Sequence, residues 1–402
     1  MKILRILHVI PSLDPAFGGP PKIAVRLAAA QAGLGHHVTM AHYHEPQAQA
    51  LIDRELAAVP HAEQVHYQTI RKPAHRPVPD RAAVAELLQT GPAGAPPDFV
   101  HFHSLWAPLT RRTADAAFAR GIPYTILLNG MLDPWSLAQK KWKKKLALLL
   151  GYKRMLDRAA FLHTGNADEV RLIAPLKIRS PHRTIPNGVF LEEISPLPAP
   201  GTFYQLFPQL DGEPFVLFLG RLHYKKGLDY LADAFAAVSA RVPRVHLVVA
   251  GPDDGARDDF VRRVNAAGIA NRVHVIGPIY EQQRLAALAE AALFCLPSRQ
   301  EGFSLAITEA LGCGLPVVIS QACHFPEVAD AGAGFVLPLD SNAFADAMVK
   351  ILTDAELRAR MSRAGAELVR TRYTWPAIAQ QTIRAYEEFG KAVRSPSVTV
   401  QS

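Results

Sequence analysis

Two glutamates eight residues apart flank the start of an expected helix in the second half of the sequence. The segment reads Glu301-Gly-Phe-Ser-Leu-Ala-Ile-Thr-Glu309 and follows an apolar run at Leu293–Pro297. Ser304 is a favourable N-cap, so free backbone N–H groups at residues 303–305 would face an anion at this helix end. Carboxylates on either side of an anion site suit a ligand with a diphosphate and hydroxyl groups at both ends, such as a nucleotide sugar. A surface helix with two solvated glutamates is the alternative that this segment leaves open.

Two turns could supply further contacts to such a diphosphate. Gly220-Arg-Leu-His-Tyr-Lys-Lys-Gly227 follows an expected strand and places Arg221 and Lys226 where a phosphate would lie. It lacks the spacing of a Walker loop. Phe17-Gly-Gly-Pro20 follows the first expected strand, and its glycines let the backbone approach an anion closely. Because this turn lacks the GxGxxG spacing, a nicotinamide cofactor is not expected. An ordinary basic turn and a plain tight turn remain the alternatives.

Short apolar runs alternate with amphipathic helical segments in both halves of the chain. This alternation is the pattern of parallel α/β sheets. The expected strands are Ile3–Ile10, His37–His42, Phe99–Phe102, Tyr124–Leu128 and Phe161–Thr164, then Phe215–Gly220, Val245–Gly251, Val273–Gly277, Leu293–Pro297 and Pro316–Ser320. Helices are expected at Pro21–Leu34 and Leu109–Ala119, and long loops at residues 44–97, which are rich in Pro and His.

The sequence therefore predicts an α/β protein with two Rossmann-like, doubly wound domains. The first is expected at residues 1–194, the second at 215–374, and a proline-rich linker at 195–214. A helix at 375–394 is expected to cross back to the first domain, and a disordered tail at 395–402. Ligands of such sheets bind at the carboxyl ends of the strands, which predicts a central cleft between the domains.

Composition and charge exclude several classes of protein. Three cysteines without CxxC spacing argue against a disulfide framework and against a structural zinc site. No apolar run reaches the length of a membrane span, and the N-terminal run is expected to be a buried strand rather than a signal peptide. Residues 1–195 hold 24 Lys and Arg against 15 Asp and Glu, whereas residues 196–402 hold 20 against 21. The uneven charge favours a local anionic partner of the first half over a general nucleic-acid binder.

A basic stretch in the first half suggests what that partner is. Lys140–Arg154 places Trp142 and three leucines at helical spacing among cations, which is typical of a helix on an anionic lipid surface. The predicted membrane-binding residues are Lys140, Lys141, Trp142, Lys143, Lys144 and Lys145. The alternative is a helix with its apolar stripe packed on the core and a solvated basic face. Nucleic acid is not expected, because no recognised motif is present.

In this order the motifs resemble those of retaining glycosyltransferase family 4, which has the GT-B fold. The resemblance rests on the GGP turn, Pro186-Asn-Gly-Val189, the basic turn and the Glu-x7-Glu segment, and it covers nearly the whole chain. It continues through EALGCGLPVVIS to Pro326-Glu327. Gly130-Met-Leu-Asp-Pro-Trp135, with the lysine-rich run after it, resembles the branch that builds bacterial exopolysaccharides and O-antigens.

The resemblance implies a role for each matching residue. Arg221 and Lys226 bind the donor diphosphate, and Glu309 holds the ribose hydroxyls. Glu301 and the backbone of Gly302, Phe303, Ser304 and Leu305 hold the transferred sugar and the phosphates. Gly19 lies under the diphosphate, and the base lies near Ile279. No metal cofactor is implied, because the chain has no Asp-x-Asp and the two cations neutralise the diphosphate.

One position departs from the family. Asn129-Gly130 stands where this branch usually has a His-Gly pair, and Asn cannot accept a proton near pH 7. In a retaining front-face reaction the leaving phosphate can take the acceptor's proton, so transfer does not require that His. Asn129 therefore remains a catalytic candidate beside Glu301, Arg221 and Lys226. His101 and His103 end another strand, and His103 is the second candidate on the acceptor side. Purely structural roles for both histidines are the alternative.

The resemblance thus predicts transfer from a UDP- or GDP-sugar to a lipid-linked saccharide in bacterial surface polysaccharide synthesis. It places the protein in the cytoplasm, peripherally on the inner face of the membrane. The alternatives are a nucleotide-sugar epimerase or hydrolase of the same fold and a degenerate sugar-nucleotide-binding protein.

Overall fold

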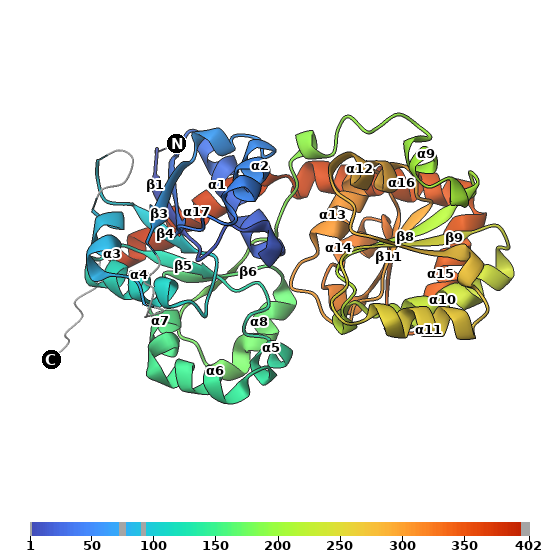
Figure 1. Ribbon diagram of the computed structural model, residues 1–402. Coiled ribbons are helices and arrows are strands. Elements are labelled where there is room, and N and C mark those ends of the chain that lie inside the picture. Colours follow the sequence, from blue (N-terminus) through green and yellow to red (C-terminus); the bar gives the residue numbers. More distant parts are fainter. Residues whose placement is uncertain (1, 72–77, 90–93, 395–402) are drawn as a thin grey trace. The chain divides into compact units, whose positions relative to one another are not determined.

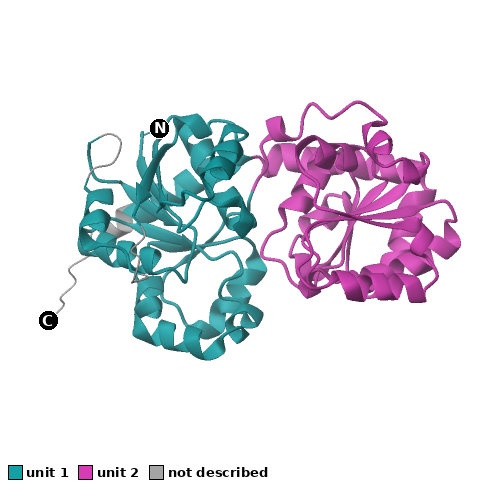
Figure 2. Cartoon of the chain, in the orientation of Figure 1, with its two compact units in different colours: residues 1–187, 375–402 teal, residues 188–374 magenta. Residues whose placement is uncertain are grey.

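The structure is a computed structural model of the chain, and it describes residues 2–71, 78–89 and 94–394. The expected disordered tail at 395–402 lies outside these residues. The chain forms two compact units, residues 1–187 with 375–402, and residues 188–374 (Figure 2). In the described parts of the chain, no helix combines the length and apolarity needed to cross a membrane.

The first unit is built on a seven-stranded parallel sheet with the order β3-β2-β1-β4-β5-β6-β7. Its strands are β1 (Arg5–Val9), β2 (His37–Tyr43), β3 (His66–Ile70), β4 (Phe99–Phe102), β5 (Tyr124–Leu127), β6 (Phe161–Thr164) and β7 (His182–Thr184). The order reverses between β1 and β4, which is the point where open α/β sheets bind ligands.

Helices cover both faces of this sheet (Figure 1). On one face, α1 (Gly19–Gly33) packs against α17 (Trp375–Arg394), the helix expected at 375–394. On the other face lie α3 (Arg81–Leu87), α4 (Pro108–Ala119) and α7 (Lys153–Asp157). The remaining helices are α2 (Gln49–Ala57), α5 (Pro134–Ala138), α6 (Lys141–Ala147) and α8 (Ala167–Ile173).

The second unit repeats this plan with six parallel strands in the order β10-β9-β8-β11-β12-β13. The strands are β8 (Phe215–Leu219), β9 (His246–Ala250), β10 (Val273–Gly277), β11 (Leu293–Leu296), β12 (Val317–Ser320) and β13 (Gly334–Leu337). The helices are α9 (Thr202–Leu206), α10 (Leu228–Arg241), α11 (Arg257–Ala266), α12 (Glu281–Glu290), α13 (Leu305–Gly312), α14 (Glu327–Asp330), α15 (Ser341–Thr353) and α16 (Ala355–Arg372). Both units are therefore doubly wound, as the alternating pattern predicts.

The prediction of long loops at residues 44–97 is wrong for the described part of that segment. It contains α2, β3 and α3. Their apolar pattern is weak because each element buries few side chains. Ile52 is the buried residue of α2, and Ile70 is the buried residue of β3. An edge strand and a mostly exposed helix need few apolar residues, so the periodicity that marks a core element is missing.

The prediction of a linker at 195–214 is also wrong. Phe203 and Leu210 are fully buried in the core of the second unit, and the Phe203 ring stacks on Phe215 at 5.2 Å between centroids. The backbone N–H of Phe203 also donates to the Glu290 carboxylate at 3.0 Å. The prolines mark irregular backbone, but the aromatic and aliphatic side chains between them have apolar surface to bury. The first boundary between the units therefore lies at 187/188, not at 194/195 or 214/215, whereas the predicted boundary at 374/375 and the return of the last helix to the first unit are confirmed.

A close backbone contact joins the β8–α10 loop to the end of β11. Gly227 has φ +68°, and a Cβ built there would lie 1.9 Å from the carbonyl oxygen of Pro297. A side chain at this position would therefore push apart two loops that the sheet brings together.

Gly227→Ala should destabilise the protein by about 3 kcal/mol, because a left-handed conformation costs an L-residue about 1–2 kcal/mol and overpacking against backbone adds about 1–3 kcal/mol. The matched control is Gly268→Ala, since Gly268 also has φ +68° but open space at its Cβ position. The control should lose only about 1 kcal/mol. Urea unfolding followed by circular dichroism measures both changes. Equal losses would show that the contact with Pro297 is unimportant.

Candidate functional site

The second unit brings Lys226 and Glu301 together at the point where its strand order reverses. Because β8 and β11 are parallel neighbours, the loops that follow them lie at the same edge of the sheet. Lys226 Nζ donates to Glu301 Oε1 at 2.6 Å, and the Ser298 hydroxyl donates to the same oxygen. The two charged side chains are only 19% and 10% exposed. The predicted phosphate-binding cation and sugar-binding carboxylate thus form one shielded ion pair.

Arg221, by contrast, does not join this pair. Its side chain is 67% exposed, and the guanidinium contacts the Asp254 carboxylate at 2.9 Å. A surface ion pair of this kind contributes little to stability. Arg221 can therefore exchange Asp254 for an anionic ligand at small cost.

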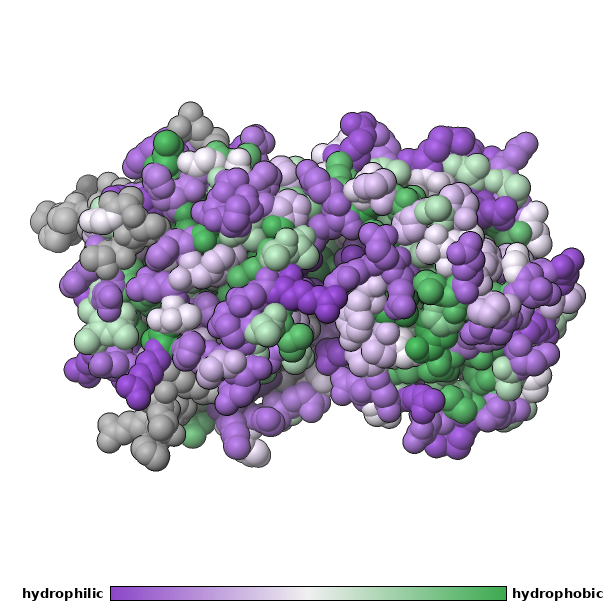
Figure 3. Space-filling model, turned by 45° about the horizontal axis from the view of Figure 1, so that its top comes forward, coloured by the Kyte–Doolittle hydropathy of each residue, from purple (hydrophilic) through white to green (hydrophobic). Residues whose placement is uncertain are grey.

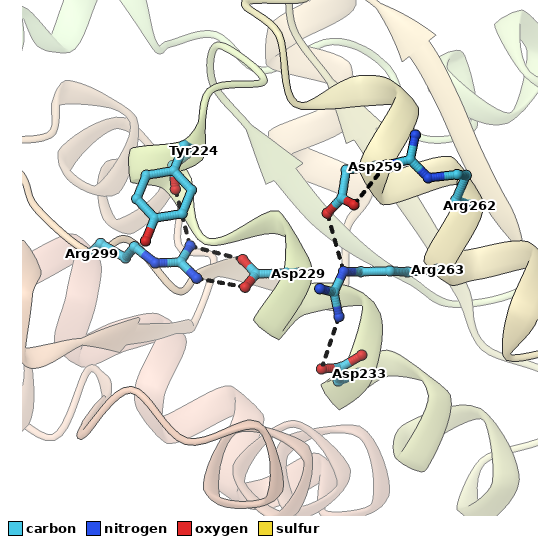
Figure 4. Close-up of polar contacts among 7 residues, drawn as sticks. All are labelled: Tyr224, Asp229, Asp233, Asp259, Arg262, Arg263 and Arg299. Atoms are coloured by element: carbon cyan, nitrogen blue, oxygen red, sulfur yellow. Dashed lines mark hydrogen bonds and ion pairs between the residues drawn. The ribbon is translucent and has the colours of Figure 1, made fainter.

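A second arginine, which the sequence reasoning missed, holds the basic turn in place. Arg299 forms a two-pronged ion pair with Asp229 at 2.8 and 2.5 Å, and it donates to the backbone oxygen of Tyr224 at 3.0 Å (Figure 4). Its guanidinium also lies over the Tyr224 ring, 4.2 Å from the centroid. Burial tends to raise the pKa of Asp229, but the bonds from Arg299 outweigh it and lower that pKa. In the sequence, the only indication that Arg299 belongs to this site is its position two residues before Glu301.

Figure 4 also shows a neighbouring ion-pair network on the surface. Arg263 contacts Asp259 at 3.1 Å and Asp233 at 3.8 Å, and Arg262 contacts Asp259 at 2.9 Å. The side chains of this network are all exposed, so its contribution to stability is small. It contributes no contact to the Lys226–Glu301 pair.

Glu309 also has a cationic partner that the sequence did not reveal. It pairs with Arg284 of α12, and the two side chains are 24% and 22% exposed. The Glu309 charge raises the pKa of Arg284 above its usual value. Glu309 therefore does not stand free for a ribose, and a ligand hydroxyl would have to share it with Arg284.

The expected helix start at Ser304 is present, but its details differ. Ser304 is the N-cap of α13, yet its side chain makes no capping hydrogen bond to the helix. The Phe303 ring packs near Phe325 and Tyr373, at 5.4 and 6.2 Å between centroids. Gly302, Phe303, Ser304 and Leu305 thus form the turn from Glu301 into α13. The Ser304 carbonyl accepts from the N–H of Ile307, but the Ser304 side chain caps none of the N–H groups of the first turn.

Ile279 does not offer a surface to a base. Its side chain is only 6% exposed and belongs to the hydrophobic core of the second unit. A base therefore cannot stack on this side chain, whose apolar surface is buried in the core. That the base lies near Ile279, against the loop after β10, stays a prediction. The next residue, Tyr280, is 64% exposed.

In the first unit, Gly19 opens α1 directly after the turn that follows β1. A Cβ at Gly19 would meet no atom within 4 Å, so the backbone here is accessible to a ligand. Gly18, the N-cap, has φ +78°. The predicted anion contact at this helix end is thus sterically possible.

Asn129 follows β5 in a left-handed conformation with φ +44°. The next residue, Gly130, is held by the buried carboxyl group of Glu169. Glu169 accepts from the N–H of Gly130 at 2.5 Å and from the N–H of Gly165 at 2.8 Å. Burial raises the pKa of Glu169 to about 7, although these two hydrogen bonds lower it in part. Glu169, which the sequence reasoning missed, therefore fixes the backbone beside Asn129.

His103 belongs to a buried group of four histidines. His8, His101, His103 and His163 are each at most 3% exposed, and burial lowers the pKa of every one, to about 4 for His8 and His163. His8, His101 and His103 are close enough together for a metal ion. However, His8 Nδ1 and His103 Nε2 lie 2.7 Å apart, which is a hydrogen bond. Two ligands of tetrahedral zinc at about 2.0–2.1 Å from the ion would lie about 3.3 Å apart, so the donor set does not fit a metal.

Known protein families match both units. The family model described as "Glycosyl transferase 4-like domain" matches residues 18–188, and "Glycosyl transferases group 1" matches residues 207–368. Together they cover more than four fifths of the chain. The chain belongs to the family 4 glycosyltransferases.

Individual relatives agree with this glycosyltransferase assignment. A phosphatidyl-myo-inositol mannosyltransferase of Mycobacterium leprae is 36% identical over 211 residues, which are 50% of this chain and 52% of that protein. The matched region thus spans about half the length of this curated relative. A crystal structure of Anabaena Alr3699/HepE with UDP and glucose covers 96% of this chain and all of its own, with TM-score 0.74 and 20% identity. WaaG, a glycosyltransferase involved in lipopolysaccharide biosynthesis, covers 94% of this chain and 98% of its own, with TM-score 0.66 and 17% identity. The fold of this glycosyltransferase is GT-B.

The lysine-rich stretch of the glycosyltransferase is not one continuous helix. It comprises α6, a π-turn at Leu148–Tyr152 in which Gly151 has φ +120°, and α7. Trp142 and Leu149 are each 77% exposed, so these apolar side chains do not pack on the core. The face drawn in Figure 3 is largely hydrophilic, with hydrophobic patches on each unit.

Lys144 differs from its four neighbours in this stretch. It donates to the backbone oxygen of Ser136 at 2.6 Å and lies over the Trp106 ring, 5.4 Å from the centroid. Burial lowers its pKa. Lys144 therefore holds α6 to the unit, and the prediction that it faces a membrane is wrong. The exposed lysines are Lys140, Lys141, Lys143 and Lys145.

The raised pKa of Glu169 predicts a pH-dependent stability. The folded protein keeps the proton of Glu169 up to about pH 7, whereas an unfolded Glu releases it near the usual value of 4.5. Between these values the folded state binds more protons, so this contribution to stability is lost as pH rises. The free energy of unfolding of the native protein minus that of Glu169→Gln should therefore fall by up to about 3 kcal/mol between pH 5 and 8. Urea unfolding measures the difference, which removes the histidine contributions common to both proteins. A flat difference would show that Glu169 is ionised throughout.

Proposed function

We propose that this family 4 glycosyltransferase moves a sugar, with retention, from a nucleoside-diphosphate sugar to a lipid-linked saccharide. The observation that carries the proposal is the shielded Lys226–Glu301 pair at the reversal of strand order in the second unit. A cation held by a carboxylate is ready to exchange that carboxylate for a diphosphate, which carries more charge. Glu301 is then released to accept hydrogen bonds from sugar hydroxyls.

The same exchange extends to the neighbouring residues. Arg221 leaves its exposed partner Asp254 for the diphosphate, and N–H groups at the start of α13, which the Ser304 side chain does not cap, add contacts to it. Glu309, which stays paired with Arg284, accepts hydrogen bonds from the ribose hydroxyls. UDP is the first choice of nucleotide because HepE, which shares the fold, was crystallised with UDP and glucose. A GDP-sugar is the second choice.

The chemistry proposed needs no metal. Lys226 and Arg221 stabilise the charge that develops on the leaving diphosphate, which is the role a divalent ion has in other glycosyltransferases. The leaving phosphate takes the proton of the acceptor hydroxyl on the same face of the sugar. Asn129 then serves through hydrogen bonds alone, since its amide both donates and accepts.

Lys226→Gln tests the donor site. The variant should weaken UDP binding at least tenfold, because it removes a hydrogen bond to a charged group, worth about 1.5–3 kcal/mol. Lys350→Gln, an exposed lysine of α15, is the control for the loss of one positive charge and should bind UDP normally. Isothermal titration with UDP, GDP, ADP and dTDP also ranks the bases. EDTA should leave both binding and transfer unchanged. Equal affinity in the two variants, or activity that requires added Mg²⁺, would contradict the proposed site.

The acceptor is proposed from the exposed apolar and basic surface of the first unit. Trp142, Leu146, Leu149 and Leu150 are 55–77% exposed, with four exposed lysines among them. Such a surface enters the interface of an anionic bilayer, and each lysine near it adds about 1 kcal/mol. The relative from M. leprae is named for a lipid acceptor, and WaaG for lipopolysaccharide. These names support a lipid-linked acceptor at the inner face of the bacterial membrane, in exopolysaccharide or lipopolysaccharide synthesis.

Changing Lys140, Lys141, Lys143 and Lys145 to Gln should release the protein from anionic vesicles while UDP binding is unchanged. The control changes the same number of exposed cations in the second unit, Arg257, Arg262, Arg360 and Arg363, to Gln. Sedimentation with vesicles of phosphatidylglycerol and phosphatidylcholine measures binding, which should weaken as salt shortens the Debye length from about 10 Å at 0.1 M to about 3 Å at 1 M. If both variants lose binding equally, attraction is by net charge and not by this surface.

A further inference from the structure

A continuous chain of side-chain hydrogen bonds runs across the α1–α17 face of the first sheet. It joins residues from β1, α1, α17, β4 and β6 and ends on a backbone carbonyl. In order, the contacts are His103 Nε2 to His8 Nδ1 (2.7 Å), His8 Nε2 to Gln31 Oε1 (2.8 Å), Gln31 Nε2 to Tyr386 Oη (3.2 Å), Tyr386 Oη to His101 Nδ1 (2.6 Å), His101 Nε2 to His163 Nδ1 (3.3 Å) and His163 Nε2 to the Ile185 oxygen (2.8 Å).

The carbonyl at the far end fixes the direction of every bond. A carbonyl only accepts, so His163 carries its proton on Nε2, and as a neutral imidazole it accepts on Nδ1. His101 must then donate from Nε2 and accept on Nδ1. The hydroxyl of Tyr386 therefore donates to His101.

The same reasoning continues to the other end of the chain. Because the Tyr386 proton is used, its oxygen accepts from the amide of Gln31, and the Gln31 carbonyl oxygen accepts from His8 Nε2–H. His8 then accepts on Nδ1 from His103 Nε2–H. One tautomer remains for His103: Nε2 carries the proton, and Nδ1 carries a lone pair.

That lone pair has no partner among the residues that the structure describes. His103 is 3% exposed, and its Nδ1 is shielded from solvent. His103 lies at the carboxyl end of β4, and its backbone N–H donates to Val9 at the end of β1. It therefore lies where the strand order of the first sheet reverses. A buried nitrogen left without a donor at such a place calls for a ligand that brings one.

The chain cannot serve as a proton relay. A proton taken up at His103 Nδ1 would have to leave at the other end, where the Ile185 carbonyl has no capacity to hold it. The chain instead fixes the tautomer of His103 and the orientation of its ring.

We infer that His103 Nδ1 accepts a hydrogen bond from a hydroxyl group of the sugar acceptor, and that His8, Gln31, Tyr386, His101 and His163 are positioning residues that keep this nitrogen unprotonated. The inference rests on the proposed function for the identity of the ligand. No bond breaks at His103, which orients the hydroxyl while the leaving phosphate takes its proton. An unprotonated ring nitrogen accepts a hydrogen bond from a hydroxyl group. It disfavours a carboxylate or ether oxygen, because the lone pair of that oxygen would face the lone pair of the nitrogen.

The tautomer can be read without any substrate. In protein labelled with ¹⁵N-histidine, long-range ¹H–¹⁵N correlation spectra should show His103 protonated on Nε2 and bare on Nδ1. In Tyr386→Phe the chain is cut, and the His103 signals should shift toward a mixture of tautomers. The His246 and His274 signals of the second unit should stay unchanged, which reports on folding. An Nδ1–H tautomer in the native protein, or an unchanged His103 in Tyr386→Phe, would overturn the inference.

Two substitutions of His103 distinguish the roles of its two ring nitrogens in transfer assays. His103→Gln places an amide near Nε2 and removes the acceptor at Nδ1, whereas His103→Asn keeps an acceptor near Nδ1. With UDP-glucose or GDP-mannose and octyl glucoside, galactoside or mannoside as acceptor probes, His103→Gln should lower kcat/KM for the acceptor at least tenfold. His103→Asn should lose less, and the donor KM should stay within twofold in both. His66→Gln, at an exposed histidine on β3, is the control.

Equal losses in the two variants would overturn the role of Nδ1. Absence of transfer by the native protein with every probe would count against the proposed function, while the spectra still decide whether His103 is held as a bare acceptor.

Discussion

The second unit depends on the close approach of two loops at the carboxyl ends of β8 and β11. Gly227 leaves no space between its backbone and Pro297, so the basic turn must lie against the loop that leads to α13. That contact places Lys226 within 2.6 Å of Glu301, although the two residues are far apart in sequence. The two loops can approach each other because β8 and β11 are parallel, so their carboxyl ends lie at the same edge of the sheet. Arg299 then fixes the basic turn through Asp229.

In the first unit, polar side chains are buried beneath the last helix, α17, and need hydrogen-bond partners there. Tyr386 of α17 stacks on Phe99 at 4.3 Å and completes the hydrogen bonds of Gln31 and His101. Without α17, buried nitrogen atoms on α1 and β4 would lose their partners, and such a loss costs about 1–3 kcal/mol for each group. The end of the chain is thus tied to the first unit by polar contacts as well as by apolar packing.

The sequence predicted those features that depend on local pattern. Of the thirteen strands in the described residues, ten were identified: the nine central strands, which are mostly buried apolar runs, and the edge strand β10. The doubly wound fold was predicted from them. The strands missed are β3, β7 and β13, three of the four edge strands, each with at most one buried residue. The fourth edge strand, β10, has no buried residue but was identified from its run of valine and isoleucine. In the site, Lys226 and Glu301 were predicted from motifs. Arg284, which pairs with Glu309, Arg299, which pairs with Asp229, and Glu169, which holds the backbone beside Asn129, were not, because an ion pair or a buried carboxyl has no sequence pattern when its partner lies on another element.

The Lys226–Glu301 pair and the hydrogen-bonded chain that begins at His103 therefore hold their polar groups in opposite ways. In the second unit, Lys226 and Glu301 are charged and paired, and such a pair can exchange its carboxylate for an anionic ligand. In the proposed function Lys226 exchanges Glu301 for phosphate in this manner, so the proposed donor site would adapt to its ligand. In the first unit the side chains linked from His103 to His163 are neutral, and the Ile185 carbonyl determines the direction of their hydrogen bonds. Reversing one bond would require reversing all of them, so that arrangement does not adapt. A reaction that must fix one hydroxyl of the acceptor against many similar ones benefits from this rigidity, because discrimination between hydroxyls depends on where the unpaired acceptor atom lies.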